Sequence, residues 1–134
     1  MKVSIDYMKR REQWAEAAEA DPIFSDVNRR VCGSWQSIHI ADCKIRNCYL
    51  SIGYLVSGGR FEYTRSWVNG SGKIFEDGTI EPAASMNQVE NRVQDYYGLR
   101  PSVVNMLMER SDEREPVEDL NSVMLDAEIW TGED

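Results

Sequence analysis

The chain has 134 residues, 42% hydrophobic and 28% charged, with a formal net charge of −8. A chain of this length buries roughly two thirds of its unfolded surface in one domain, and this composition excludes intrinsic disorder. No apolar stretch is long enough to cross a membrane and three cysteines do not close a disulfide framework, so we expect a soluble cytoplasmic protein with a single domain over residues 1–134.

The first predicted element is a helix that starts near Ser4 or Asp6 and ends at about Ala20. Residues 10–20 are strong helix formers, and the residue before Pro22 avoids the α region, which ends the helix. A short second helix is expected from Ser25 or Asp26 to Val31.

The first predicted helix also carries the basic run Lys9-Arg10-Arg11. A nucleic-acid footprint usually needs a larger patch of one sign, and this run is diluted by Glu12, Glu16 and Glu19. We therefore interpret it as a solvated helix face.

The middle of the chain changes to a strand-like period. Three segments rich in β-branched and aromatic residues are separated by turn signals, which predicts strands over Trp35–Cys43, Cys48–Ser57 and Arg60–Val68. Gly58-Gly59 is typical of a two-residue hairpin loop. The resulting register would place one apolar set on a buried face: Leu50, Ile52, Tyr54, Val56, Phe61, Tyr63 and Trp67. Short further strands are expected near residues 73–75 and 80–81.

Helical periodicity returns after Pro82. Ser85 and Gln88 form a capping box, and Gly98 suits the position just past a helix end. Pro101 suits the first turn of a helix that runs to Met108, and Pro116 the first turn of a last helix. The predicted fold class is therefore α+β: an N-terminal helix, a central antiparallel β-meander of four to five strands, and C-terminal helices packing on the sheet.

The negative charge is confined to the acidic C-terminal segment, residues 112–134. Residues 1–111 carry 14 acidic and 14 basic side chains, whereas the segment carries nine acidic side chains and Arg114 as its single base, which accounts for the whole net charge. Such asymmetry indicates an electrostatic partner surface, and its sign argues against direct binding to a phosphate backbone. The alternative interpretation is a solubilising helix that packs an apolar stripe inward.

The sequence lacks the motifs of conventional catalysis. It contains no nucleophile elbow, no HExxH and no glycine-rich dinucleotide fingerprint, and His39 is its single histidine. We therefore expect no enzymatic activity and no cofactor. The alternative, an unfamiliar site in a concavity of the meander, would use Arg65, Tyr54 or Tyr63.

All three cysteines and the histidine fall between positions 32 and 48. Cys32, His39, Cys43 and Cys48 are the right number and type of ligands for a tetrahedral zinc site. A straight strand would place His39 and Cys43 about 13 Å apart, at about 3.3 Å per residue, which is too far to share one ion. We therefore predict no metal, with a zinc-stabilised interaction domain as an alternative.

The functional prediction is a non-enzymatic protein-binding inhibitor or accessory factor. It would engage the basic surface of a nucleic-acid-handling protein, with no direct nucleic acid and no membrane as partner. By analogy, small acidic proteins of this kind include phage and mobile-element inhibitors, anti-CRISPR proteins among them. An immunity-type protein that neutralises a toxin is a further alternative. The predicted partner-binding residues are the acids of the C-terminal segment with Trp130 as an anchor: Glu113, Glu115, Glu118, Asp119, Asp126, Glu128 and Trp130.

Overall fold

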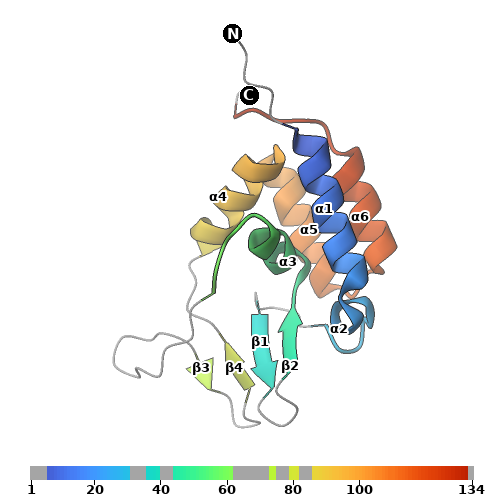
Figure 1. Cartoon of the computed structure of the whole chain (residues 1–134), viewed down its shortest axis with the longest axis vertical. Coiled ribbons are helices and arrows are strands. Elements are labelled where there is room, and N and C mark those ends of the chain that lie inside the picture. Colours follow the sequence, from blue (N-terminus) through green and yellow to red (C-terminus); the bar gives the residue numbers. More distant parts are fainter. Residues whose placement is uncertain are drawn as a thin grey trace.

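The computed structural model describes residues 6–30, 36–39, 44–61, 73–74, 79–81 and 86–132. Within these ranges the protein is mostly helical, with the helices forming the body and four short strands lying together at one end (Figure 1). In chain order the elements are α1 (Tyr7–Ala20), α2 (Pro22–Ser25), β1 (Gln36–His39), β2 (Lys44–Asn47), α3 (Tyr49–Val56), β3 (Lys73–Ile74), β4 (Thr79–Glu81), α4 (Met86–Tyr97), α5 (Pro101–Asp112) and α6 (Val117–Asp126).

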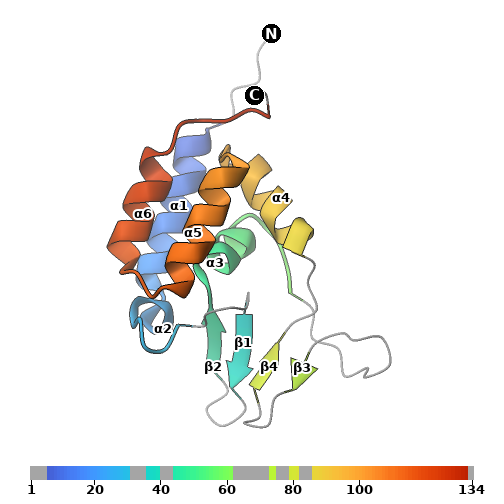
Figure 2. The ribbon, with the colours of Figure 1, turned by 180° about the vertical axis from the view of Figure 1, so that it is seen from behind.

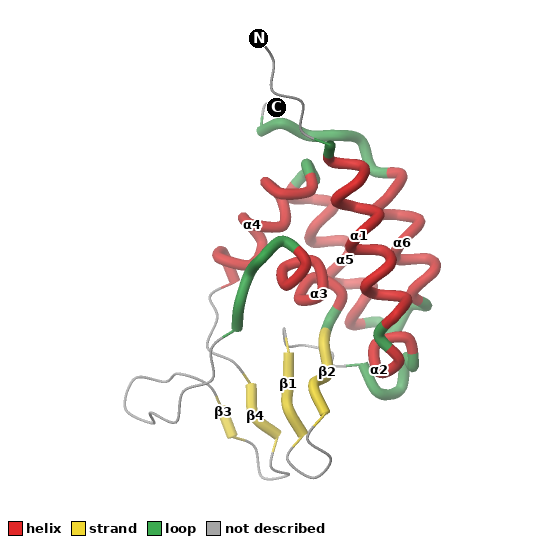
Figure 3. The backbone as a smooth tube through the Cα atoms, in the orientation of Figure 1, coloured by secondary structure: helices red, strands yellow, loops and turns green. Residues whose placement is uncertain are grey.

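The predicted α+β fold with a central meander is wrong. Residues 49–56, predicted as a strand of the buried hairpin, form helix α3, which is enclosed by α1, α4 and α5 (Figure 3). Every residue from Tyr49 to Tyr54 is buried, so the helix has no polar face. A helix that is apolar all round belongs in a core, and its short sequence has no helical period to reveal it.

Gly58-Gly59 ends α3 and closes no hairpin. Gly58 has a φ of 93°, and the Gly58 and Gly59 N–H groups donate to the carbonyls of Leu55 and Tyr54 at 3.0 and 2.9 Å. These bonds form the Schellman motif, in which a left-handed residue lets the chain satisfy the last helix carbonyls. Hairpin loops and helix ends both need positive φ, which is why glycine signals either.

The sheet is small and lies apart from the helical core. Its order is β2-β1-β4-β3 with antiparallel pairs, so β1 pairs with its neighbour in sequence and also with the distant β4 (Figure 2). Ile38 stands opposite Ile45 on one side and Ile80 on the other. Of the predicted apolar face, Tyr63 and Trp67 lie outside the described residues.

The helices predicted at the two ends of the chain are confirmed. Helix α1 starts after Asp6, whose side chain accepts from the Lys9 N–H at 2.9 Å, and ends at Ala20. Helices α4, α5 and α6 lie where capping and proline signals placed them, with α5 running four residues past Met108. The short second helix is displaced: α2 spans Pro22–Ser25, because Asp21 caps it at once by accepting from two of its N–H groups.

The core is built around aromatic rings. Trp14 is fully buried, with its ring centroid 4.7 Å from that of Tyr49 and 4.6 Å from that of Tyr97. Its indole N–H donates to the Tyr49 carbonyl at 3.1 Å, and the Tyr97 hydroxyl donates to the Gly53 carbonyl at 2.6 Å. Helices α1, α3 and α4 are thereby locked together by paired rings with satisfied polar groups.

Arg11 joins the two ends of the chain inside the bundle. It is fully buried, and its guanidinium donates to the carbonyls of Tyr97 and Gly98, both at 2.9 Å, and of Met124 and Ala127, at 3.3 and 2.5 Å. These carbonyls lie at the C-terminal ends of α4 and α6, where the helix dipole is negative. Burial lowers the pKa of Arg11, and the converging carbonyls compensate the buried charge.

Candidate acidic interface

Most of the predicted interface acids are on the surface. Glu113, Glu118, Asp119, Asp126 and Glu128 are exposed, on α6 and on the segments before and after it. The buried side of α6 consists of an apolar stripe around one amide: Val117, Leu120, Asn121 and Met124. Helix α6 is therefore attached by its apolar side and presents carboxylates outward, which both interpretations of the C-terminal segment require.

The other two predicted interface residues, Glu115 and Trp130, are partly buried and contact their own chain. The Glu115 carboxylate pairs with Arg110 at 3.3 Å, and the Glu115 backbone carbonyl accepts from the buried Arg30 at 2.6 Å. Trp130 is partly buried, and its backbone N–H donates to the Gly98 carbonyl at 2.8 Å. Its indole N–H is buried and has no hydrogen-bond partner among the described residues. Trp130 thus packs partly against its own chain, and its role as an interface anchor stays a prediction.

The basic run of α1 is not a solvated face, contrary to the prediction. Arg11 is fully buried, and Arg10 lies over the Tyr96 ring at 4.1 Å while it donates to the Tyr96 carbonyl at 2.9 Å. Lys9 remains exposed. Arg11 therefore adds no charge at the surface and Arg10 is held against Tyr96, which leaves Lys9 as the exposed cation of the run.

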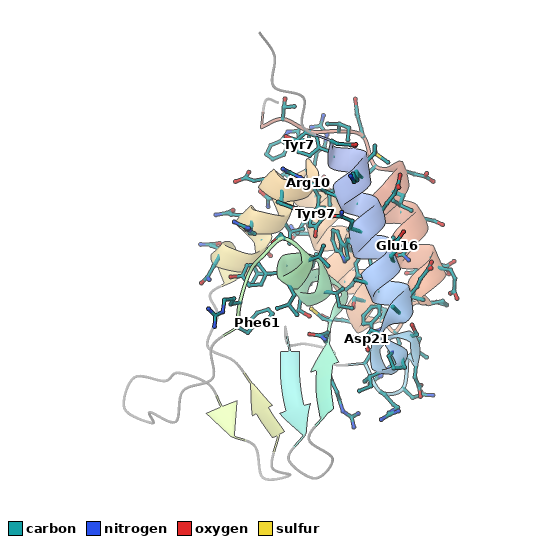
Figure 4. All side chains as sticks on the ribbon, viewed as in Figure 1. Tyr7, Arg10, Glu16, Asp21, Phe61 and Tyr97 are labelled. Carbon is teal, nitrogen blue, oxygen red and sulfur yellow. The ribbon has the colours of Figure 1, made fainter. Side chains whose placement is uncertain are left out.

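The acids of α1 stay outside and were missed as interface candidates. Glu12, Glu16 and Glu19 are all exposed, and Figure 4 shows Glu16 projecting from α1 on the side of α6. In the sequence they looked like counterions of the basic run. Their spacing could have identified them as surface residues. Glu12, Glu16 and Glu19 are four and three residues apart and so share one side of the helix, which differs from the side that carries Trp14 and Ala18.

Contacts between α1 and α6 show which stripes of the two helices adjoin. The Asn121 amide donates to the Ala15 carbonyl and to the Glu19 carboxylate, both at 3.2 Å. On α1, Met8, Glu12, Ala15 and Glu19 follow the three- and four-residue spacing of one stripe. On α6, Glu118, Asn121 and Leu125 do the same.

We call these two stripes together the α1–α6 seam. The helices run antiparallel, since Arg11 reaches Met124 whereas Glu19 reaches Asn121. Glu19 and Glu118 therefore lie at one end of the seam, and Met8 and Leu125 at the other. Acids from the neutral and the acidic parts of the sequence form one surface.

Two of the acids also have a structural role within α6. Glu118 and Asp119 occupy its first turn, and Pro116 before them offers no side-chain cap. Carboxylates near a helix N-terminus complement the macrodipole by about 0.3–1 kcal/mol each. Their presence in α6 thus has a local cause as well as a possible partner.

Cys48, one of the four proposed zinc ligands, serves as the N-cap of α3. It is 2% exposed, and its sulfur accepts from the Ser51 N–H at 3.4 Å. Burial raises the pKa of its thiol to about 11. Cys32 and Cys43 lie outside the described residues, and His39 is described only as part of β1.

Of the residues considered for an unfamiliar catalytic site, the structure places Tyr54, which lies in helix α3 and not in a meander strand. Tyr54 is 4% exposed in α3, its hydroxyl accepts from the Gln88 amide at 2.8 Å, and its ring packs on Phe61 at 5.1 Å. Tyr63 and Arg65 lie outside the described residues. Across the described ranges, no group of three or more His, Cys, Asp and Glu residues is placed to hold a metal ion.

Nor does any helix in the described part of the chain have the length and apolar character needed to span a membrane. Comparison with known proteins adds no family: no protein-family model, no curated protein and no solved structure matches this chain. The case for function therefore depends on the surface chemistry of the molecule itself.

Proposed function

We propose that this protein is a non-enzymatic, protein-binding inhibitor or accessory factor that engages a basic surface of its target through the acids of α1, α6 and the neighbouring C-terminal residues. The expected target is a nucleic-acid-handling protein, as for anti-CRISPR-like proteins of phages and mobile elements. Direct binding to nucleic acid or membrane is not part of the proposal, since phosphate groups would be repelled by this surface.

The observation that carries the proposal is a separation of charge between the inside and the outside of α1. Arg11 is withdrawn into the core and Arg10 is packed on Tyr96, while Glu12, Glu16 and Glu19 remain exposed beside α6. A surface of one sign steers a complementary partner and raises the rate of encounter.

The test begins with affinity capture from a lysate of the host at low salt and the identification of a retained protein. Its association rate is then measured by surface plasmon resonance against a Glu16→Gln/Glu118→Gln variant. We expect association to slow several-fold in low salt and the dependence on ionic strength to flatten, because exposed interface charges act on the on-rate.

The matched control is Asp95→Asn/Glu109→Gln, which removes two exposed acids from α4 and α5. It changes the net charge equally but leaves α1 and α6 intact. If the two variants slow association equally, only the total charge matters and the proposed surface is wrong. If neither variant changes the rate at any salt concentration, the acidic residues are a solubilising face.

A further inference from the structure

The acidic surface has an apolar end. Among the described residues the large hydrophobic side chains that are exposed are Met8 at 39%, Ile129 at 40% and Leu55 at 38%. Leu55 belongs to α3, whereas Met8 opens α1 and Ile129 follows α6. Single exposed apolar residues are common on proteins, so their meaning depends on whether they lie together and on what surrounds them.

The hydrogen bonds of the C-terminal segment hold Ile129 at the same end of the bundle as Met8. Arg11, one helical turn after Met8, donates to the Ala127 carbonyl at 2.5 Å, and the Trp130 N–H donates to the Gly98 carbonyl at 2.8 Å. Arg11 also donates to Gly98 at 2.9 Å. The segment after α6 thereby passes the N-terminal end of α1 (Figure 1), and Ile129 lies between its two hydrogen-bonded points.

Leu125 belongs to the same end of the seam. It is partly buried against the core and lies on the α6 stripe that adjoins α1, four residues after Asn121. Met8 lies on the facing stripe of α1. Met8, Leu125 and Ile129, called the apolar anchor below, thus combine two exposed side chains with one that is partly buried.

Carboxylates surround the apolar anchor and continue along the seam. Asp126 and Glu128 flank it in sequence, and Glu12, Glu19 and Glu118 extend from it along α1 and α6, all of them exposed. Lys9 is an exposed cation next to Met8, but consecutive helical residues point about 100° apart, which turns Lys9 away from the seam. The surface is therefore apolar at one end and negative along its length.

We propose that the α1–α6 seam receives a basic amphipathic helix of the partner, whose apolar side chains contact Met8, Leu125 and Ile129 and whose Lys and Arg side chains contact the carboxylates. This inference rests on the proposed function and specifies its partner. An amphipathic helix combines an apolar stripe with flanking charges at the spacing that such a surface needs. A second copy of this chain would bring carboxylates against carboxylates, and an anionic membrane would be repelled likewise.

The test uses two fluorescent peptides of identical composition, made of leucine and lysine. One places leucine at helical a and d positions, and the other scatters the same residues so that no apolar face forms. Binding is measured by fluorescence anisotropy. We expect the amphipathic peptide to bind at least about tenfold more tightly, since a few central apolar contacts dominate such interfaces.

The decisive variant is Met8→Ser/Ile129→Ser, with Leu55→Ser as the control of equal exposure. We expect the double variant to weaken binding of the amphipathic peptide about tenfold and to leave binding of the scattered peptide unchanged. Leu55→Ser should change the affinity of neither peptide. Because all three side chains are exposed, the variants should keep the fold, which circular dichroism checks.

The outcomes separate this inference from the proposed function. If the two peptides bind equally, or if Leu55→Ser weakens binding as much as the double variant, the apolar anchor is refuted although an acidic binding surface stands. If Glu12→Gln/Glu118→Gln, which removes two carboxylates of the seam, also leaves peptide binding and its salt dependence unchanged, the acidic surface fails as well. If neither peptide binds, the apolar anchor and the acidic binding surface are both refuted.

Discussion

Replacing Gly53 by Ala tests the packing of α3 against α1. A Cβ at this position would lie 2.6, 2.8 and 2.8 Å from three carbons of the Trp14 indole, closer than real side chains approach. Trp14 has no room to retreat, because it is fully buried between Tyr49 and Tyr97 and donates a hydrogen bond to the Tyr49 carbonyl.

Two opposing effects set the magnitude of the change. Glycine to alanine inside a helix gains about 1 kcal/mol from propensity, whereas overpacking a core typically costs about 1–3 kcal/mol. The rigid ring places Gly53→Ala at the upper end of the cost, so we expect a net loss of about 2 kcal/mol. Urea unfolding followed by circular dichroism should show a midpoint lowered by about 1 M.

The same substitution distinguishes the helix from the predicted hairpin. In that hairpin Gly53 would sit on the polar face, and alanine there would be nearly neutral. Trp14→Phe removes part of the indole, so Gly53→Ala should be less destabilising in that background, with a coupling above about 1 kcal/mol. An unchanged or raised midpoint for Gly53→Ala alone would refute the packing described above.

Three further outcomes follow from buried and capping groups. Arg11→Met should cost at least about 3 kcal/mol in urea unfolding, because it removes the guanidinium that donates to four carbonyls, and a smaller loss would mean that water replaces the guanidinium. The thiol of Cys48 has its pKa raised from 9.0 to about 11, so the stability it contributes is present below pH 9 and is lost as pH rises toward 11. Cys48→Ser should flatten this part of the stability profile, and identical slopes for both proteins would contradict the assignment. Glu118→Gln/Asp119→Asn should lower the free energy of unfolding by about 0.3–1 kcal/mol per charge and so lower the thermal midpoint slightly. A higher midpoint would show that repulsion among the acids outweighs their interaction with the α6 dipole.

The ends of the chain could be predicted because their signals are local. Asp6, Pro22, Pro101 and Gly98 each constrain the backbone at their own position, and the helices begin or end beside them. The stripe on α6 could likewise be read from spacing, since one side of that helix faces water. Local chemistry therefore determined the helix boundaries beside these residues to within a few positions.

The centre of the chain could not be predicted in this way. Leu50, Ile52 and Tyr54 alternate as in a strand, yet all are buried in α3 because α1, α4 and α5 pack around its first six residues. The decision between strand and helix depended on α1 and α4, which lie far away in sequence. Periodicity carries little information in a short helix whose residues are nearly all buried.

The candidate interface was half predictable for a related reason. The acids after residue 112 are marked by net charge alone, whereas those of α1 appeared to be balanced by Arg10 and Arg11. Only the fold shows that Arg11 is buried and that Arg10 packs on the Tyr96 ring. Formal charge along the sequence therefore underestimates the charge that a surface presents.

The Arg11 clamp also affects the order of events during synthesis. Its acceptors lie 86 to 116 residues downstream, so α1 leaves the ribosome long before Gly98 or Ala127 exists. Until then a cationic side chain destined for the core must stay hydrated. The bundle can therefore close only when the chain is nearly complete, and contacts of such long sequence separation make folding slower than in helical proteins whose contacts are local.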